Sequence, residues 1–253
     1  RFGFGENWKD FLKVLNADRI AEAESTLRKM LEIDNLEGKT FLDIGSGSGL
    51  FSLAARNLGA SVFSFDYDPS SVWCTKELRN KFYKNDESWT IEEGSVLNPE
   101  YIDSLGKFDV VYSWGVLHHT GDMWTALNNI KNSVNVDGKL FIALYNHQQF
   151  ASLYWSMVKK LYVKTRLFRP FFLLIHLIYP TLPSILIKLI QGKKPPRGMT
   201  YWYDLKDWLG GYPFETSTPA EVFNYYKINN YELTKLKTVG AKMGCNEFVF
   251  KRI

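Results

Sequence analysis

Cysteine is scarce in this chain of 253 residues. Its two cysteines, Cys74 and Cys245, lie 171 positions apart. That number and spacing exclude a disulfide-stabilised scaffold and the paired-cysteine pattern of a structural zinc site. We therefore expect a reducing, cytoplasmic setting. The chain begins at Arg1 without a basic-then-apolar leader, and we treat this start as truncated.

Acidic side chains are missing from one long stretch. Between Asp137 and Asp204 lie 66 residues without Asp or Glu, and they hold ten of the 31 lysines and arginines. The rest of the chain has 21 basic and 27 acidic residues, so an acidic body carries a basic segment. This asymmetry favours an anionic partner or surface, although a solvated basic face has the same composition.

Hydrophobic residues, in contrast, are abundant enough to build a core. They make up 45% of the chain, and charged residues make up 23%. This balance excludes intrinsic disorder, collagen-like repeats and coiled coils. We expect one domain of ordinary enzyme size over residues 1–253.

Short apolar runs alternate with helical patterns along the chain. The spacing of apolar residues predicts a first helix around 20–31 that ends before Gly38. Asp68 with Pro69, and Thr218 with Pro219 and Glu221, have the pattern of helix starts. Strands are predicted at 40–44, 61–65, 89–92, 108–113, 140–144, 231–238 and 246–251, and further helices at 50–58, 68–84, 122–134 and 218–227.

This order predicts an α/β fold with a doubly wound, Rossmann-like sheet of seven strands. We expect N-terminal helices, a C-terminal antiparallel hairpin, and a helical or lid insertion after the fifth strand over residues 147–215. Within the insertion, Pro170–Ile187 is 18 residues without a charged side chain. Three interpretations stay open: a packed lid, an interfacial helix pair that contacts a membrane through 168–197, and a spanning helix, which its prolines disfavour.

A glycine-rich loop follows the first predicted strand. Glycines at positions 45, 47 and 49 let the backbone turn sharply and approach a ligand closely. The third glycine of a dinucleotide fingerprint would fall at Leu50 or Ser52, so neither register fits NAD.

An acidic residue ends the second predicted strand about twenty residues later. In nucleotide-binding versions of this fold, a carboxylate at that position accepts hydrogen bonds from a ribose diol. Asp66 is our candidate, whereas Asp68 is better explained as a helix cap. Tyr67 is positioned to lie along an adenine or simply to cover the sheet edge.

These motifs resemble those of the class I S-adenosylmethionine-dependent methyltransferases. Leu42–Gly49 resembles their first motif, Asp66 their ribose-binding acid and Phe108–Ser113 their fourth strand, while Trp114–His119 is similar to the ubiquinone-biosynthesis O-methyltransferases. The resemblance implies S-adenosylmethionine as cofactor, with S-adenosylhomocysteine as product. The cofactor-binding residues it implies are Asp43, Gly45, Ser46, Gly47, Gly49, Asp66, Tyr67, Ser95, Val96 and Trp114.

The resemblance also divides the chain by expected role. Residues 1–37 form an N-terminal helical cap, 38–146 the cofactor-binding core, 147–215 the apolar and basic lid insertion, and 216–253 the final helix and hairpin. Gly115 and His118 stand where the metal-using relatives would have acids, so no metal is expected.

Two histidines are the candidates for a general base. His118 and His119 follow the fourth strand, at the edge where open α/β sheets bind ligands, and histidine titrates near neutrality. We favour His119 over His118. The predicted substrate residues are Asn146, Tyr203, Asp207, Trp208 and Tyr212, which include part of an aromatic cluster suited to a hydrophobic acceptor.

The expected reaction is O-methylation of a small acceptor that is hydrophobic or anionic. A lipid-linked molecule would also fit this description of the acceptor. Two alternatives remain: a methyltransferase acting on tRNA or rRNA, and a non-catalytic cofactor-binding scaffold that docks on membranes. The chain lacks a recognisable RNA-binding appendage and the Asn-Pro-Pro-aromatic tetrad after Ser113, so we expect no nucleic-acid partner.

Overall fold

The computed structural model describes residues 8, 11–178, 205 and 208–253. The chain divides into two compact units. The sheet unit comprises Phe4–Gln148 and Glu215–Ile253, and the insertion unit comprises Arg1–Gly3 and Gln149–Phe214. The limits of the insertion unit thus lie close to those predicted for the insertion, 147–215.

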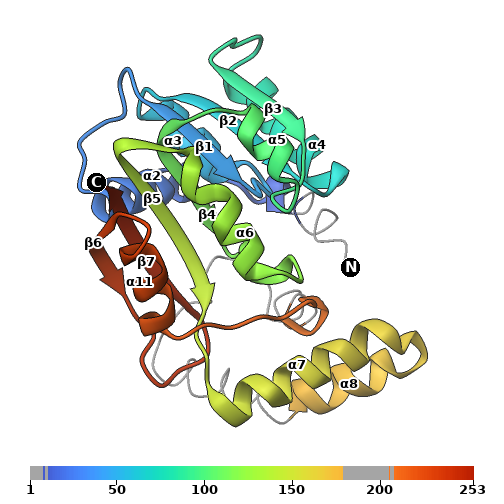
Figure 1. The fold of residues 1–253 in the computed structure, drawn as a ribbon. Coiled ribbons are helices and arrows are strands. Elements are labelled where there is room, and N and C mark those ends of the chain that lie inside the picture. Colours follow the sequence, from blue (N-terminus) through green and yellow to red (C-terminus); the bar gives the residue numbers. More distant parts are fainter. Residues whose placement is uncertain (1–7, 9–10, 179–204, 206–207) are drawn as a thin grey trace. The chain divides into compact units, whose positions relative to one another are not determined.

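The sheet unit is built on seven strands in the order β3-β2-β1-β4-β5-β7-β6 (Figure 1). The first five are parallel, whereas β7 is antiparallel to both β5 and β6. The predicted doubly wound sheet with a C-terminal antiparallel hairpin is therefore confirmed. The strands are β1 (Thr40–Ile44), β2 (Ser61–Asp66), β3 (Trp89–Glu93), β4 (Phe108–Trp114), β5 (Val134–Tyr145), β6 (Tyr231–Lys237) and β7 (Cys245–Arg252).

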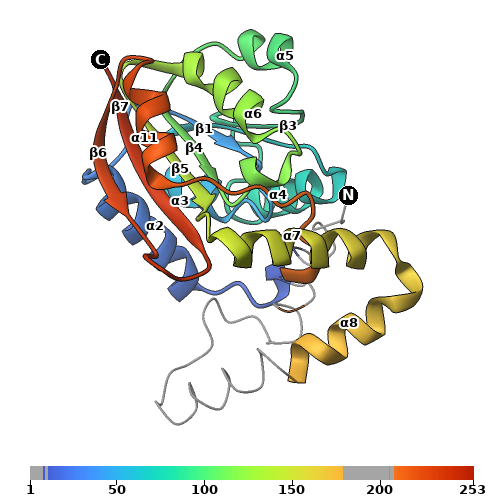
Figure 2. The same ribbon diagram turned by 60° about the horizontal axis from the view of Figure 1, so that its bottom comes forward.

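Helices cover both faces of this sheet (Figures 1 and 2). On one face the core contains residues of α2 (Ala17–Leu31), α3 (Leu50–Asn57) and α4 (Pro69–Phe82). On the other it contains residues of α5 (Pro99–Ser104), α6 (Met123–Ile130) and α11 (Pro219–Lys227). Short 3₁₀ turns, η1 (Leu117–His119) and η2 (Lys131–Ser133), flank α6.

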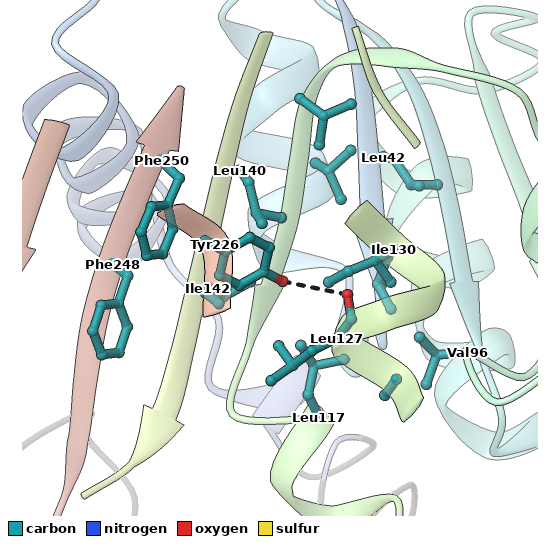
Figure 3. Packing of buried hydrophobic residues seen from close by; sticks show 14 of the residues in the cluster. Leu42, Val96, Leu117, Leu127, Ile130, Leu140, Ile142, Tyr226, Phe248 and Phe250 are labelled. Atoms are coloured by element: carbon teal, nitrogen blue, oxygen red, sulfur yellow. Dashed lines mark hydrogen bonds between the residues drawn. The ribbon is translucent and has the colours of Figure 1, made fainter. Parts of the chain in front are cut away.

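Successive residues of the central strands enter different cores. Phe41 and Phe141 pack on the side of α2–α4, while their neighbours Leu42 and Leu140 pack on the side of α5, α6 and α11. This follows from the two-residue period of a strand and explains why the strand sequences are apolar throughout. In the second core, shown in Figure 3, Tyr226 of α11 donates its hydroxyl to the Leu127 carbonyl at 3.5 Å.

Helix α2 ends at Leu31, as predicted, and Glu32 after it adopts a left-handed conformation with φ of 52°. Two other elements differ from the predictions. Strand β5 begins at Val134 rather than near Leu140, and its first half was hidden by polar residues and by Asp137, which has a φ of 63°. Helix α5 was not predicted, although its start, Asn98 followed by Pro99, repeats the pattern that marks α4.

The insertion unit contains a helical hairpin. Helix α7 (Gln149–Lys164) is followed by the turn η3 (Arg166–Phe168) and helix α8 (Arg169–His176) (Figure 2). Within the part of the chain that the structure describes, no helix reaches the length and apolarity needed to cross a membrane. The second half of the predicted apolar stretch Pro170–Ile187, residues 179–187, lies outside the described residues.

The capping box predicted for the last helix is present. The Glu221 N–H donates to Oγ1 of Thr218 at 3.2 Å, and the Thr218 N–H donates to Oε2 of Glu221 at 2.7 Å. Both backbone donors would otherwise lack an intrahelical partner.

We expect Thr218→Ala to lower the free energy of unfolding by about 1 kcal/mol, because it removes the side-chain acceptor of this cap. Thr238→Ala is the matched control: Thr238 is exposed and lies beyond β6, so its change should be below about 0.5 kcal/mol. Urea unfolding followed by circular dichroism measures both. Equal effects of the two substitutions would contradict the cap.

Candidate functional site

The predicted site residues of the sheet unit gather at one edge of the sheet. Strands β1 to β5 are parallel and in register. Their carboxyl ends therefore meet at the same edge, where open α/β sheets bind ligands. The residues at those ends are Ile44, Asp66, Glu93, Trp114 and Tyr145.

The glycine loop between β1 and α3 needs glycine for both conformation and space. Gly45, Gly47 and Gly49 have φ values of 77°, 56° and 80°. A Cβ at residue 45 would lie 2.5 Å from the Val116 side chain, and one at residue 47 would lie 3.1 Å from the Trp8 ring. The loop is thus closely approached from two sides, which L-residues with side chains would prevent.

The loop is also hydrogen-bonded to the end of β2 and to α4. The N–H groups of Gly45 and Ser46 both donate to the Phe65 carbonyl, at 2.8 and 3.1 Å. The Ser46 hydroxyl lies 2.9 Å from Oγ1 of Thr75 in α4. These bonds fix the backbone of the loop, and the Gly49 N–H adds a bond within it to the Ser46 carbonyl at 2.8 Å.

Asp43 lies buried beneath the loop. Its carboxylate accepts from the Ser52 hydroxyl at 2.5 Å, Ser52 accepts from Ser64 at 2.8 Å, and the Trp89 indole donates to Ser64 at 2.9 Å. This chain of hydrogen bonds joins β1, α3, β2 and β3. Burial raises the pKa of Asp43 to about 7, while the bonds from Ser52 oppose the shift.

Asp66 is held by the backbone on both sides. Its carboxylate accepts from the Gly47 N–H and from the Asp68 N–H, each at 2.9 Å. Burial raises its pKa to about 6, against the effect of these two donors, and the Asp68 charge adds to the rise. Asp68 itself accepts from the Ser70 N–H at 2.9 Å and so caps α4. This is the helix-cap role that the sequence favoured for Asp68.

The end of β3 approaches Asp66 through its backbone. The Gly94 N–H donates to the Asp66 carbonyl at 3.0 Å. Beyond it, Ser95 accepts from the Leu97 N–H with its hydroxyl, and Val96 is buried in the core. Tyr67 is 59% exposed, so its side chain has room to lie along a ligand at this edge.

The turn after β4 is fastened to the glycine loop and to β5. The Ser113 hydroxyl donates to the Ile44 carbonyl at 2.9 Å, and Val116 fills the space above Gly45. Trp114 packs partly against the core that contains α2–α4. The turn therefore keeps the two histidines at a fixed distance from the loop.

The two histidines differ in burial. His118 is fully buried, and its Nδ1 accepts from the Tyr145 N–H at 3.2 Å while its ring stacks on Tyr145 at 3.9 Å between centroids. His119 is half-buried and packs edge-on against Tyr145 at 5.4 Å. An Nδ1 that accepts leaves the proton of a neutral imidazole on Nε2.

Glu215, the first residue after the insertion unit, also fastens this turn. Its N–H donates to the His118 carbonyl at 3.0 Å, and its carboxylate accepts from the N–H groups of Gly121 and Met123 at 3.0 and 3.1 Å. The acceptor thus lies at the start of α6, where a negative charge is favoured. Burial raises the pKa of Glu215.

The predicted substrate residues that the structure describes are divided between the two units. Asn146, in the sheet unit, donates to the Gly240 carbonyl at 2.8 Å and accepts from Asn246 at 3.0 Å, so a substrate role would use the second N–H or lone pair of its amide. Trp208 and Tyr212 belong to the insertion unit. Tyr203 and Asp207 lie outside the described residues.

Several residues that build the site were missed by sequence reasoning. Thr75, Ser113 and Val116 carry no motif signal, because they act by packing and by single hydrogen bonds. Trp8 and Glu215 were not among the predicted site residues either. Among the described residues, no group of three His, Cys, Asp or Glu side chains is arranged to hold a metal ion.

Comparison with known proteins gives the family. A family model described as a methyltransferase domain matches residues 15–175, more than half of the chain. A ubiquinone biosynthesis O-methyltransferase of Glaesserella parasuis is 29% identical over 113 residues, which are 45% of this chain and 48% of that protein. A tRNA U34 carboxymethyltransferase of Photorhabdus laumondii is 32% identical over 116 residues, 46% of this chain and 35% of that protein. The chain thus spans half or less of the curated relatives it matches.

Solved structures share the fold at low sequence identity. The magnesium protoporphyrin IX methyltransferase of Synechocystis, solved with bound S-adenosylhomocysteine, has a TM-score of 0.55 and 14% identity, with 92% of this chain and 83% of that chain covered. The YcgJ protein of Bacillus subtilis has a TM-score of 0.58 and 11% identity, with 92% and 98% covered.

The chain therefore belongs to the methyltransferase domain family and has the class I fold. Its Synechocystis structural neighbour was solved with S-adenosylhomocysteine and with S-adenosylmethionine bound. The resemblance of the glycine loop, of Asp66 and of the fourth strand to this class is confirmed at the level of family and fold.

We expect Gly45→Ala to lower the free energy of unfolding by about 3 kcal/mol or more, because a Cβ there adds overpacking against Val116 to a left-handed backbone. Gly106→Ala is the matched control, since Gly106 has a φ of 78° and nothing within 4 Å of its added Cβ. It should cost about 1 kcal/mol. Chemical denaturation measures both, and equal losses would show that Val116 yields without cost.

Proposed function

We propose that this protein transfers the methyl group of S-adenosylmethionine to an oxygen atom of a small acceptor that is hydrophobic or anionic. The observation that carries the proposal is the meeting of three elements at one sheet edge: the glycine loop, the Asp66 carboxylate and the His118–His119 turn. The glycine loop and the Asp66 carboxylate suit a nucleoside with a bulky charged tail. The His118–His119 turn supplies a proton acceptor beside that nucleoside.

The residues present fit the cofactor. Glycines at 45 and 47 let the Val116 side chain and the Trp8 ring lie directly against the loop backbone, and we assign this closely approached stretch to the methionine part. Asp66 would accept from the ribose hydroxyls, with Tyr67, Ser95 and Val96 bordering the adenine. Once bound, the cofactor supplies a methyl group already activated by its positive sulfonium.

His119 is the better base of the two histidines. The Nδ1 of His118 is occupied by the Tyr145 N–H and its ring is buried, so a second proton there would break a buried hydrogen bond. His119 is partly exposed in the same turn. In the proposed reaction a hydroxyl of the acceptor gives its proton to His119 as the new C–O bond forms and the C–S bond breaks.

The aromatic side chains of the insertion unit support a hydrophobic acceptor. Trp208 packs edge-on against Trp155 with ring centroids 5.2 Å apart, and against Phe214 at 6.1 Å. Together with Tyr212, this cluster would offer ring surfaces to an aromatic or isoprenoid group. The lid role of residues 147–215 is part of this proposal.

A tRNA acceptor is the second candidate. It is favoured by the basic segment and by the tRNA U34 carboxymethyltransferases, which match at an identity similar to that of the ubiquinone biosynthesis enzymes. Methyl-labelled S-adenosylmethionine separates the two. Label in a lipid extract or in phenols supports the proposal, whereas label in bulk tRNA alone would replace it.

We expect Asp66→Asn to weaken S-adenosylhomocysteine binding by about tenfold or more, because a charge-assisted acceptor is lost. Asp68→Asn, two residues away, keeps a side chain that can cap α4 and should leave the affinity unchanged. Isothermal titration calorimetry measures both variants. If Asp66→Asn binds as well as the wild type, Asp66 does not hold the ribose.

The Asp66 carboxylate should also make the affinity for S-adenosylhomocysteine depend on pH. Ribose hydroxyls bind its ionised form, so affinity for S-adenosylhomocysteine should be full above pH 7 and should fall by up to about tenfold toward pH 5, through the pKa of about 6. In Asp66→Asn this step should be absent.

We expect His119→Ala to slow methyl transfer by about 100-fold while cofactor affinity is unchanged. His147→Ala, an exposed histidine after β5, is the control and should leave the rate unchanged. His118→Ala should instead lower the free energy of unfolding by about 1–3 kcal/mol, since it leaves the buried Tyr145 N–H without its acceptor. A normal rate in His119→Ala would remove the base assignment.

A further inference from the structure

Helix α7 is apolar on two opposite faces. Its inner face contributes Val158 and Tyr162 to the core of the insertion unit. The outer face carries five exposed apolar or aromatic side chains, which recur at helical spacing and so form one stripe. They are Phe150, Leu153, Tyr154, Met157 and Leu161, exposed by 85, 64, 50, 56 and 42%.

Helix α8 and the turn before it repeat this pattern. Their exposed apolar side chains again recur at intervals of three and four, from η3 to just beyond the helix. They are Leu167, Phe168, Phe171, Leu174, Ile175 and Ile178, exposed by 86, 57, 57, 55, 40 and 55%. An exposed apolar surface of this extent marks an interaction site.

The two helices are joined firmly enough to present this surface as one piece. His176 of α8 is buried, and its Nε2 lies 3.0 Å from the Tyr154 hydroxyl. Phe172 packs edge-on against Tyr162 at 6.4 Å. The Arg169 guanidinium donates to the carbonyls of Tyr162 and Val163 at the end of α7. Contact with a partner therefore needs little further ordering of the pair.

The basic side chains beside the apolar stripe indicate which kind of partner this surface contacts. Lys160 and Lys164 are exposed on α7, adjacent in helical position to Leu161 and Met157, and no acidic residue occurs between Asp137 and Asp204. A second copy of the same surface would bring these lysines against each other without a counter-charge. An anionic bilayer offers both an apolar layer for the stripe and phosphates for the lysines.

We propose that α7, η3 and α8 dock on the surface of a bilayer that contains anionic lipid. The apolar stripe enters the boundary between headgroups and acyl chains, and Lys160 and Lys164 lie among the phosphates. This contact goes beyond the methyl transfer and does not depend on which acceptor is methylated.

Vesicle flotation tests the proposal on the full chain. The wild type should float with phosphatidylcholine vesicles that contain phosphatidylglycerol, and much less with phosphatidylcholine alone. Leu167→Ser with Phe171→Ser should lower the partition coefficient by at least about tenfold. Lys160→Gln with Lys164→Gln should lower it by roughly 30-fold, since each basic residue near such a surface contributes about 1 kcal/mol.

The matched control is Val136→Ser with Ile228→Ser, two residues of the sheet unit that are 67 and 80% exposed. This double variant should float like the wild type. Calorimetry with S-adenosylhomocysteine on every variant shows that the cofactor core is folded, which keeps this test separate from that of the methyl transfer.

Three results would overturn the proposal. One is a wild type that does not float with anionic vesicles, and another is a Leu167 and Phe171 variant that floats unchanged. The third is a dimer, detected by light scattering without vesicle binding, that the same substitutions abolish; the surface would then be an interface between copies of the chain.

Discussion

The absence of a side chain at residue 45 is the constraint on which the site depends. The Val116 side chain occupies the place of its Cβ, so the loop after β1 and the turn after β4 can lie this close only with glycine there. The same approach sets where His118 and His119 stand, two and three residues beyond Val116. One missing methyl group thus couples the conformation of the glycine loop to the placement of the candidate base.

Two carboxylates, Asp43 buried and Asp66 partly buried, give this region its electrostatic character. Asp43 closes a hydrogen-bonded chain that reaches Trp89 in β3, and Asp66 receives N–H groups from the loop and from its own strand end. Both have raised pKa values because burial outweighs these donors. Asp43 holds β1, α3, β2 and β3 together through its hydrogen bonds, whereas Asp66 lies at the strand end, where a ligand can reach it.

Most of the sheet could be predicted from the sequence because its signals are local. Apolar runs and the Asp68–Pro69 and Thr218–Pro219 starts mark the strands and helices directly. The prediction of β5 failed where conformation overrode composition, at Asp137 with its positive φ. No local rule marks that position.

The site was predictable only in part. The glycine loop, Asp66 and the histidine pair have recognisable residue types at recognisable spacing. The partners that hold them do not: Thr75, Ser113 and Val116 are ordinary residues whose importance comes from the fold. Likewise, the sequence favoured His119 over His118 without a physical reason, because their difference is one of burial and of a single bond from Tyr145.

The insertion leaves and re-enters the sheet unit at one point. The chain on either side is paired: the Ser217 N–H donates to the Tyr145 carbonyl at 3.0 Å, the His147 N–H donates to the Ser217 carbonyl at 3.1 Å, and Glu215 bonds to the turn that carries the histidines. The two ends are thus held together by the sheet unit itself. During evolution the whole insertion could therefore be exchanged, lengthened or lost without disturbing the sheet unit. Such a change could alter the acceptor or the location of the protein in the cell, while the part of the chain that carries the methyl-transfer site stayed the same.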